Sequence, residues 1–415
     1  MQQAVSTIAM PQKQRKWPKE GWTRVPYWVY TDPDIYQREL DTFFYGNTWN
    51  FVGLECEIPE KGSYKRSWIG ERQVVIVRGE HDQIHIWENR CAHRGARLCW
   101  KNKGKEESFT CPYHQWNFAL DGKLQGVPLK RGMLKKGGMP PDFDNADHGL
   151  TPLSVHLLGG TIWANFSKDP VPFETYCGEV ATTYLRRLFP GKKLKLLGYN
   201  RQLIESNWKL YFENLKDPYH ATLLHSFLIT FGLWRADSQS ESIPCESGHS
   251  VMASRNVGKK KNDASDEIAR FNDALVLNDR DSVTPRSEFD DGKVIGIIHF
   301  PSVIIHQQAN TFGMRHVIPK GHDAFELEWT YFGYEDDDDE MTRLRVRHAN
   351  LYGPAGYVAM EDGEVLTESQ LGAHHADDHA AVLEMGGKDV EKQDHMVTEV
   401  MIRAFYKYYK EKLGL

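Results

Sequence analysis

Four side chains in the first third of the chain have the types and spacing of a metal-cluster ligand set. The motifs Cys91-Ala92-His93 and Cys111-Pro112-Tyr113-His114 each place one cysteine close to one histidine. Two thiolates and two imidazoles suit a [2Fe–2S] cluster with cysteines on one iron and histidines on the other, and the neutral imidazoles raise its potential. A zinc site accepts the same side chains, but zinc sites usually pair cysteine with cysteine and histidine with histidine. The mixed halves therefore favour the iron–sulfur cluster.

A second candidate metal site begins near residue 208. Good helix formers predict a helix over Trp208–Leu215, and Pro218 ends or restarts it because proline lacks a backbone donor. Asp217 then occupies the N-cap of a new helix. On a regular helix the five residues from His220 to His225 turn through about 140°. We therefore expect a π-type bulge or a strongly bent helix, unless both histidines are ordinary core or surface residues.

An acidic pair in the tract Gly353–Glu364 offers a third ligand. Two histidines and one carboxylate leave half of an octahedron open, which is the facial triad of non-haem Fe(II) oxygenases. Glu361 and Asp362 are the candidates, and the open positions would let O2 and a substrate meet at the metal. An acidic pair alone carries little weight, because such pairs commonly cap helices or face water.

These motifs together make the chain resemble the large (α) subunit of Rieske non-haem iron aromatic-ring-hydroxylating oxygenases. The resemblance covers nearly the whole chain and rests on Cys91-x-His93-Arg94-Gly95, Cys111-x-x-His114-x-Trp116, Glu213-Asn214…Asp217-x-x-His220-x4-His225 and Gly353-Pro-Ala-Gly…Glu361-Asp362. It implies two ligand sets, which are Cys91, His93, Cys111 and His114 for the [2Fe–2S] cluster and His220, His225 and Asp362 for the mononuclear iron. It also implies that Asp217 forms a hydrogen-bonded bridge to a Rieske histidine of a neighbouring subunit.

The resemblance implies an enzyme that hydroxylates an aromatic ring with O2 and yields a cis-dihydrodiol or a phenol. Electrons from NAD(P)H would arrive through a ferredoxin or a flavin reductase and pass through the cluster to Fe(II). A small β subunit and an α3 or α3β3 assembly are implied as well. Two alternatives stay open, namely a Rieske oxygenase that demethylates or uses a non-aromatic substrate, and a zinc or iron–sulfur protein for electron transfer or binding.

Within this family the chain looks closest to the branch that acts on aromatic carboxylates such as salicylate, anthranilate or terephthalate. A buried carboxylate needs a paired cation, and arginine suits it through its bidentate fork. We expect one polar strand, Ile304–Arg315, whose Arg315 corresponds to an arginine of relatives that act on aromatic acids. The alternative for Arg315 is a surface position at a sheet edge. Three further candidates for substrate contact are His306, Gln308 and Asn214.

Composition limits the partners and the cellular setting. The chain has 51 Lys+Arg and 57 Asp+Glu, a net charge of −6, which argues against nucleic acid as a partner. It shows no run of about 18 apolar residues and no charged-then-apolar leader, so we expect no membrane contact and a cytoplasmic protein. In a reducing cytosol the cysteines outside the two motifs should be free thiols, and these are Cys56, Cys99, Cys177 and Cys245.

The order of patterns along the chain predicts two domains in an α+β protein. Residues 1–45 form an N-terminal segment packed on the catalytic domain, with a helical pattern from Asp34 to Phe44. Residues 46–165 form the Rieske domain, in which short strands build a β-sandwich with both cluster motifs on loops. The expected strands cover Trp49–Leu54, Gln73–Arg78, Ile84–Glu88 and Gly160–Phe166.

Residues 166–415 form the catalytic domain that holds the mononuclear iron. Helical stretches alternate there with long strands, predicted over Val294–His306 and Ala324–Tyr334. This mixture predicts an antiparallel sheet covered by helices. An amphipathic helix is expected over Asp394–Leu415.

Three polar tracts receive structural interpretations. Glu335–Glu340 precedes an expected helix over Met341–Leu351, where acidic residues favour the N-terminus, and a calcium site is the alternative. Lys259–Lys261 is expected in a solvated loop that could help to dock an acidic ferredoxin. His374–His379 holds residue types of a metal site, but Gly372 predicts a loop that is structural or forms the rim of the active site.

Overall fold

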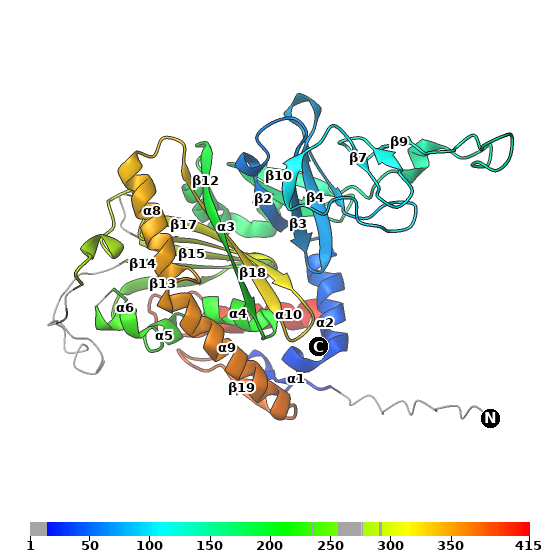
Figure 1. Cartoon of the computed structure of the whole chain (residues 1–415). Coiled ribbons are helices and arrows are strands. Elements are labelled where there is room, and N and C mark those ends of the chain that lie inside the picture. Colours follow the sequence, from blue (N-terminus) through cyan, green and yellow to red (C-terminus); the bar gives the residue numbers. More distant parts are fainter. Residues whose placement is uncertain (1–14, 232, 235, 256–274, 276, 290–292) are drawn as a thin grey trace, which may run out of the picture.

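The computed structural model describes residues 15–231, 233–234, 236–255, 275, 277–289 and 293–415. Figure 1 shows a smaller part made of short strands beside a larger part made of long strands and helices. The described N-terminal residues share a core with the helices of the larger part. The prediction of an α+β protein, with a β-sandwich part and an antiparallel sheet-and-helix part, is confirmed.

Short antiparallel strands build the smaller part as three sheets with the orders β10-β11-β2, β5-β4-β3-β6 and β7-β8-β9. Their bounds are β2 (Asn50–Leu54), β3 (Ser63–Ile69), β4 (Arg72–Arg78), β5 (Ile84–Glu88), β6 (Lys103–Lys105), β7 (Phe109–Thr110), β8 (Asn117–Phe118), β9 (Leu124–Gly126), β10 (Ser154–Leu158) and β11 (Thr161–Asn165). Successive side chains of a strand point to opposite sides, and β4 buries both sides. Val74 and Ile76 join the core shared with the N-terminal helices, whereas Val75 and Val77 join the core beneath the cluster motifs. The four strands predicted in this region are confirmed.

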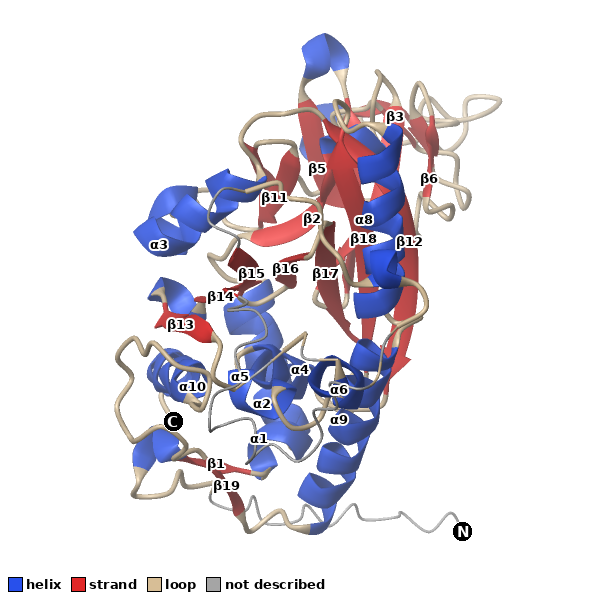
Figure 2. Ribbon diagram, turned by 90° about the vertical axis from the view of Figure 1, so that its left-hand side faces the viewer, coloured by secondary structure: helices blue, strands red, loops and turns tan. Residues whose placement is uncertain are grey.

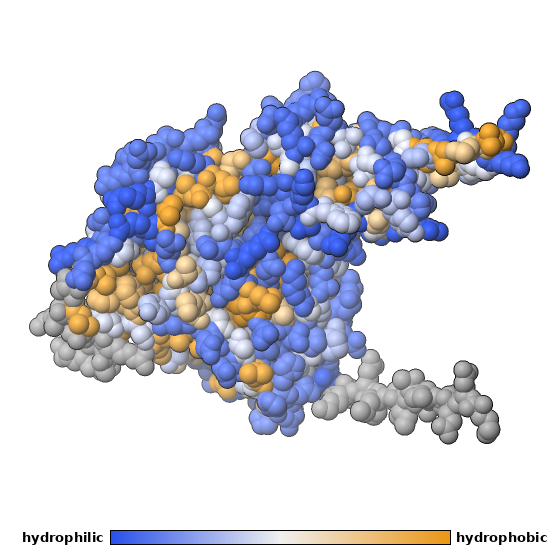
Figure 3. Space-filling view, viewed as in Figure 1, coloured by the Kyte–Doolittle hydropathy of each residue, from blue (hydrophilic) through white to orange (hydrophobic). Residues whose placement is uncertain are grey.

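A long loop projects from the smaller part beyond β9 (Figure 1). This segment, residues 127–140, is called the basic loop below. Figure 3 shows apolar side chains near its tip, where Leu129, Met133 and Leu134 are largely exposed. The segment contains cations but no acidic residue, and the cations are Lys130, Arg131, Lys135 and Lys136. The loop thus presents a surface that is both apolar and positively charged.

One antiparallel sheet of seven strands forms the centre of the larger part, in the order β12-β18-β17-β16-β15-β14-β13. Its strands are β12 (Leu194–Ile204), β13 (Gln239–Pro244), β14 (Ser250–Arg255), β15 (Lys293–His299), β16 (Val303–Gln308), β17 (Thr311–Pro319) and β18 (Phe325–Tyr334). The helices are α3 (Phe173–Leu188), α4 (Trp208–Leu215), α5 (Pro218–Ala221), α6 (Ser226–Thr230), α8 (Asp339–Tyr352), α9 (Tyr357–His375) and α10 (Val400–Leu413).

Helices cover both faces of this sheet. Alternate residues of β15 show the division, because Ile295 and Ile297 pack in the core of α3, whereas Ile298 packs with Trp208 of α4 in the other core. Figure 2 shows α4, α5, α6 and α9 gathered below the strands. The candidate iron ligands lie on or beside these helices.

The N-terminal segment closes the core under α4. It comprises β1 (Arg24–Pro26), which pairs with β19 (Ala380–Val382), and the helices α1 (Trp28–Thr31), α2 (Pro33–Glu39) and the π-helical turn η2 (Leu40–Phe44). The helix predicted from Asp34 to Phe44 is therefore confirmed as α2 followed by η2. Buried hydrogen bonds tie Tyr30 and Tyr406 to Glu213 of α4, at 3.1 and 2.5 Å. The residues before Asn214 are thus fixed from two sides.

Two strand predictions in the catalytic sheet are wrong. The run Val294–His306 forms two strands, β15 and β16, joined through Phe300-Pro301-Ser302. Pro301 has no N–H group to donate, so a hydrogen-bonded ladder cannot continue through it. The polar run Ile304–Arg315 is likewise two strands, because β16 and β17 form a hairpin that turns at Ala309, whose φ is +50°.

One helical prediction and one loop prediction differ from the structure. The C-terminal helix α10 begins at Val400 instead of Asp394. Gly372 lies inside α9 and not in a loop, so His374 and His375 form the last turn of that helix. The helix expected over Met341–Leu351 is confirmed as α8, where Asp338 accepts a hydrogen bond from the Met341 amide at 2.7 Å. The tract Lys259–Lys261 lies outside the described residues.

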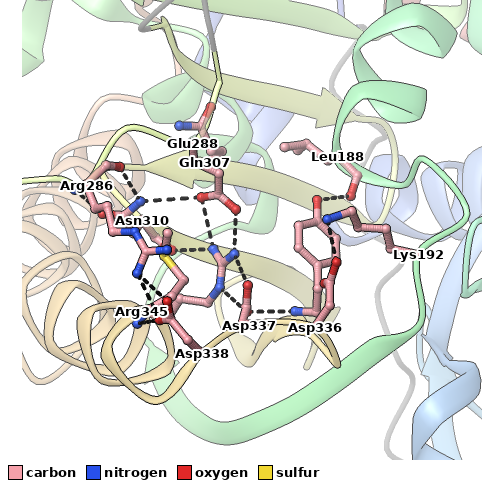
Figure 4. Close-up of polar contacts among 12 residues, drawn as sticks. Leu188, Lys192, Arg286, Glu288, Gln307, Asn310, Asp336, Asp337, Asp338 and Arg345 are labelled. Carbon is pink, nitrogen blue, oxygen red and sulfur yellow. Dashed lines mark hydrogen bonds and ion pairs between the residues drawn. The ribbon is translucent and has the colours of Figure 1, made fainter.

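Arg345 of α8 supports the β16–β17 hairpin from below. Its guanidinium is fully buried and donates to Glu288 at 2.5 Å, to Asp337 at 2.6 Å and to the Asn310 carbonyl at 2.8 Å. Figure 4 shows these groups converging on Arg345. Because Asn310 lies in the hairpin turn, this network holds the two strands that carry Gln308 and Arg315.

A buried charge cluster joins the smaller part to the catalytic sheet. Lys65 of β3 lies between Glu57 at 2.8 Å and Glu328 of β18 at 3.1 Å. Arg201 of β12 reaches Glu328 at 2.8 Å, and the Tyr199 hydroxyl donates to Glu57. Burial raises the pKa of Glu328, but Lys65 and its neighbours outweigh this effect and hold the pKa at about 2. The joint between the two parts is therefore ionic and desolvated.

Two candidate metal centres

The two cluster motifs form loops of the same construction. The Cys91 carbonyl accepts from the Gly95 amide at 2.9 Å, and the Cys91 amide donates to Ala96 at 2.8 Å. The second loop repeats this pattern at Cys111, with Gln115 at 3.0 Å and Trp116 at 2.8 Å. Gly95 and Gln115 occupy the same place in each loop with φ of +73° and +58°. Glycine enters this region without the cost that a side chain brings, so its presence in the first motif has a local reason.

The ligand atoms of the two loops face one another. The side chains of Cys91 and Cys111 are buried, and the ring centres of His93 and His114 lie 4.5 Å apart. Within the part of the chain that the structure describes, the Nδ1 atoms of both histidines are buried without a hydrogen-bond partner. Buried polar atoms are rarely left unpaired. Two thiols and two orphaned imidazole nitrogens fit a [2Fe–2S] cluster that completes all four.

Neighbouring residues hold this ligand set in place. Trp116 stacks on His93 at 4.6 Å with an interplanar angle of 4°. Burial raises the pKa of the Cys91 thiol, so the thiolate form needs the positive charge that iron supplies. Cys99 packs in the core beneath the loops, where burial raises its pKa to about 12. Cys56, Cys99, Cys177 and Cys245 form no disulfide.

The first two candidate iron ligands lie on either side of a turn. Helix α4 covers the predicted residues Trp208–Leu215, and Asp217 caps α5 by accepting from the amides of Tyr219 at 2.8 Å and His220 at 3.2 Å. Helix α5 then ends at Ala221, and His225 is the N-cap of α6. The expected π-bulge or bent helix is wrong, because a turn closed by the Leu224 amide on the His220 carbonyl at 2.8 Å separates two short helices.

Asp362 of α9 completes the group. Its Oδ1 lies 3.5 Å from Nε2 of His220 and 3.5 Å from Nε2 of His225, and the three potential ligand atoms lie within 4.8 Å of one another. Burial lowers the pKa of His220, but Asp217 and Asp362 outweigh it and raise the pKa to about 10. The group thus favours positive charge. Two imidazoles and a carboxylate around one point fit a mononuclear iron with open positions.

One cavity of about 50 Å³ connects this group to the hairpin. It is lined by the three candidate ligands and by Gln308 and Arg315, with apolar walls from Leu228, Met252 and Val358. Asn214 lies against the ligand group, with Nδ2 at 3.1 Å from Asp362 and 3.2 Å from His220. His306 is not among the lining residues, but its Nδ1 accepts a hydrogen bond from the lining residue Arg315 at 3.2 Å.

Arg315 is buried and is held by neutral groups. Its guanidinium donates to Nδ1 of His306 at 3.2 Å, to the Tyr211 hydroxyl at 3.3 Å and to Gln308 at 3.5 Å. It also lies 4.5 Å from the ring centre of Trp329, its partner across β17 and β18. No carboxylate of the described residues forms an ion pair with it. The alternative of a surface position at a sheet edge does not apply, since Arg315 lies on the inner strand β17 and is 3% exposed.

The hairpin register explains how these side chains share one face. Gly313 pairs with His306, and Thr311 pairs with Gln308. A Cβ atom on Gly313 would lie 2.2 Å from Cε1 of His306, so only glycine admits the imidazole here. Tyr211 and Trp329 were not predicted as contacts of Arg315. Trp329 could have been found from its register opposite Arg315, but only after the hairpin between β16 and β17 had been recognised.

In a third group of metal-ligand types, not predicted from the sequence, one of the histidines is held by the backbone. Cys177, His249 and His299 lie together in the core. However, Nδ1 of His249 accepts from the Phe300 amide at 3.0 Å and Nε2 faces the Tyr176 carbonyl at 3.0 Å. Both nitrogens of His249 are therefore used by the backbone, and the group packs the contact between α3 and the sheet.

Comparisons with known proteins agree with this geometry. The family model of the Rieske [2Fe-2S] domain matches residues 48–136, and that of the ring hydroxylating alpha subunit (catalytic domain) matches residues 175–415. The chain belongs to the ring-hydroxylating α subunits. Membership makes it an oxidoreductase with a [2Fe–2S] cluster and a mononuclear iron, supplied with electrons by partner proteins.

Three relatives match this chain over almost its whole length and almost all of their own. The chain is 47% identical over 407 residues to the large oxygenase component of salicylate 5-hydroxylase from Ralstonia sp., with 96% of each chain covered. It is 41% identical to the large subunit of anthranilate 1,2-dioxygenase from Burkholderia cepacia, covering 96% of this chain and 95% of the relative. It is 38% identical to a terephthalate 1,2-dioxygenase α subunit from Comamonas sp., covering 94% and 96%.

Solved structures share the fold of this α subunit. Naphthalene 1,2-dioxygenase from Rhodococcus sp. bound to indole matches with a TM-score of 0.77 at 22% identity, over 94% of both chains. A quaternary ammonium Rieske monooxygenase matches with a TM-score of 0.74 at 17% identity, over 97% of this chain and 100% of that one. Among the described helices, none is long and apolar enough to span a membrane.

Proposed function

We propose that this α subunit hydroxylates the ring of an aromatic carboxylate similar to salicylate or anthranilate. The observation that carries the proposal is Arg315, a buried guanidinium without a carboxylate partner among the described residues, in the cavity that holds the candidate iron ligands. A desolvated cation of this kind is stabilised by an anion, and an aromatic acid would supply one. Relatives named for salicylate, anthranilate and terephthalate support the same substrate class.

We also propose which residues bind the two metal groups. Cys91, Cys111, His93 and His114 would hold the cluster, and His220, His225 and Asp362 would hold the iron. When bound, these groups supply one-electron transfer and the activation of O2. The chain itself binds and orients the acid. Arg315 holds its carboxylate, Gln308 contacts a neighbouring substituent, and the apolar walls exclude water from the ring.

His306 is proposed to position Arg315 instead of touching the substrate. Burial and the adjacent guanidinium lower the pKa of His306, so its neutral Nδ1 can accept the Arg315 Nε–H. Asn214 is proposed to orient His220 and Asp362, since its amide nitrogen lies close to both. These roles place the substrate contacts on the hairpin and the ligand contacts on the helices.

Asp217 is proposed to carry electrons between subunits. Its Oδ1 is used by two amides of α5, whereas Oδ2 lies 3.5 Å from Nδ1 of His220. The side chain is partly exposed, which would leave it accessible to a Rieske histidine of a neighbouring subunit. The bridge would then consist of two imidazoles joined by one carboxylate.

The assembly and the redox partners complete the proposal. A bridge between chains requires a ring of subunits, and we propose α3 or, with a small β subunit, α3β3. The exposed apolar residues of the basic loop support an assembled state, because soluble monomers rarely present such patches. A ferredoxin or a flavin reductase would deliver electrons from NAD(P)H. The domain limits 1–45, 46–165 and 166–415 and a cytoplasmic location remain predictions.

The test is product analysis with isotopically labelled O2. The purified α subunit, supplied with a ferredoxin and a reductase, is incubated with benzoate, salicylate, anthranilate and their amides. We expect label on the ring carbons of the acids and little conversion of the amides. A methoxybenzoate that releases formaldehyde without ring label would favour the demethylase alternative, and equal conversion of acids and amides would refute the carboxylate as the recognised group.

A further inference from the structure

Glu361 holds one of the two candidate iron-binding histidines from behind. Its Oε2 lies 2.9 Å from Nδ1 of His225, and the His225 side chain is 4% exposed. We propose that Glu361 is a positioning residue that fixes the ring orientation and the tautomer of His225 for metal binding. The inference rests on the proposed function, because it takes His225 as an iron ligand.

The direction of the hydrogen bond follows from the chemistry of the two groups. A carboxylate only accepts hydrogen bonds, so Nδ1 of His225 must carry the proton. The lone pair of the neutral ring then lies on Nε2, which is the atom that faces Asp362 at 3.5 Å. Glu361 therefore selects the tautomer in which the correct nitrogen is free to bind a cation.

Both histidines follow this pattern, but their carboxylates have different second tasks. Nδ1 of His220 faces Asp217 at 3.5 Å, and Asp217 also caps α5 through its other oxygen. Glu361 makes the shorter contact, 2.9 Å, and caps no helix. If Asp217 also caps α5 and contacts another subunit, it holds His220 less firmly. The fixed orientation of the two histidines then depends mainly on the hydrogen bond between Glu361 and His225.

Glu361 and the candidate ligand Asp362 lie on the same helix, α9. Glu361 and Asp362 are consecutive, and consecutive residues of a helix point about 100° apart. Asp362 thus faces Nε2 of His225, while Glu361 contacts Nδ1 of the same ring. Helix α9 thus supplies the ligand Asp362 and orients the ligand His225. The distance between these two ligands is therefore kept when α9 shifts.

The physical consequence is an increased affinity for the metal. A carboxylate on the distal nitrogen restricts ring rotation and makes the binding nitrogen more basic, and loss of such a partner typically lowers metal affinity by 10–100-fold. A neutral amide at the same place can still accept the hydrogen bond but contributes no charge. The expected order of affinity is therefore wild type, then Glu361→Gln, then Glu361→Ala.

The experiment compares Glu361→Ala and Glu361→Gln with Glu364→Gln, a control at an exposed position three residues further along α9. The assembled enzyme is stripped of mononuclear iron, and the dissociation constant for Fe(II) is measured against a competing chelator. Co(II) bound in place of Fe(II) also reports the ligand geometry through its EPR spectrum. The oxidised cluster gives no EPR signal and therefore does not obscure that of Co(II). We expect Fe(II) affinity to fall about 10–100-fold in the alanine variant and less in the glutamine variant, with an altered Co(II) spectrum and unchanged cluster absorbance.

The outcomes separate this inference from the proposal on which it rests. Unchanged Fe(II) affinity and Co(II) spectra in both Glu361 variants would overturn the positioning role. If Asp362→Ala also retains full Fe(II) affinity, then the ligand assignment itself fails. A lowered melting temperature with unchanged Fe(II) affinity would make Glu361 a structural residue only and would overturn the inference as well.

Discussion

Replacement of Arg315 by alanine tests the proposed recognition of the carboxylate most directly. The guanidinium is 3% exposed, and its neighbours Tyr211, His306 and Gln308 are neutral. Burial and Arg315 itself keep the pKa of His306 below its usual range, so His306 cannot supply the missing positive charge. The substrate carboxylate would therefore enter a desolvated cavity without a cation.

Loss of one partner from a buried charge pair costs about 2–5 kcal/mol. At 1.4 kcal/mol per factor of ten, kcat/KM for an aromatic acid should fall roughly 30- to 4,000-fold. Arg315→Lys should recover only part of this loss, because an ammonium group cannot reproduce the planar two-point contact. The assay is steady-state product formation with salicylate or anthranilate and with the corresponding amide, which should lose its disadvantage in the alanine variant.

Controls exclude a general loss of structure. Iron and sulfide content should equal those of the wild type in both Arg315 variants, and Arg343→Ala, an exposed change in α8, should retain full kcat/KM. If Arg315→Ala oxidises the acid as the wild type does, then the carboxylate is held elsewhere. Arg235, which lies outside the described residues, is the next residue to replace.

Four further substitutions test the metal centres and the joint. Asp217→Ala should leave the spectrum of the reduced cluster intact while turnover collapses, and near-normal turnover would reduce Asp217 to a helix cap. Cys91→Ala should abolish the visible absorbance of the cluster, whereas Cys99→Ala should keep it, and the reverse result would exchange their roles. Glu328→Gln should lower the free energy of unfolding by about 3 kcal/mol at pH 7, since Lys65 and other cations overcome burial and lower the Glu328 pKa from 4.5 to about 2. This stabilisation is present above pH 4.5 and is lost as the pH falls to 2, so the two proteins should converge near pH 2 in denaturant titrations, and a constant difference would contradict the assignment.

The candidate metal-binding motifs could be predicted from the sequence because each motif consists of residues that lie close together in the chain. Cys91 and His93 lie in one turn, as do Cys111 and His114, and the backbone of each turn repeats the same hydrogen bonds. The cap at Asp217 was also local, since it depends only on Pro218 and the next amides. In each case the residues that define the feature lie within six positions of one another.

Turns without a clear sequence signal and contacts between different elements were missed. The apolar run through β15 and β16 gave no signal for a turn other than Pro301, and the hairpin at Ala309 contains no typical two-residue turn sequence. The contacts of Arg315 with Tyr211 and Trp329 come from α4 and β18, far along the chain. The ring geometry of His220 and His225 was missed because an isolated helix was assumed where α5 stops after four residues.

The charge cluster around Lys65 has a consequence for how electrons are delivered. A swing of the cluster-bearing part away from the catalytic sheet would break the buried contact of Lys65 with Glu328 and the hydrogen bond from Tyr199 to Glu57, although Lys65 would keep Glu57 and Glu328 would keep Arg201. The two parts should therefore behave as one rigid body. The cluster is then not expected to travel between its reductant and the iron, and in the proposed assembly the distance over which an electron passes is set by the way subunits stack. Substitutions at the contacts between subunits should thus change the rate of electron transfer even where no ligand is altered.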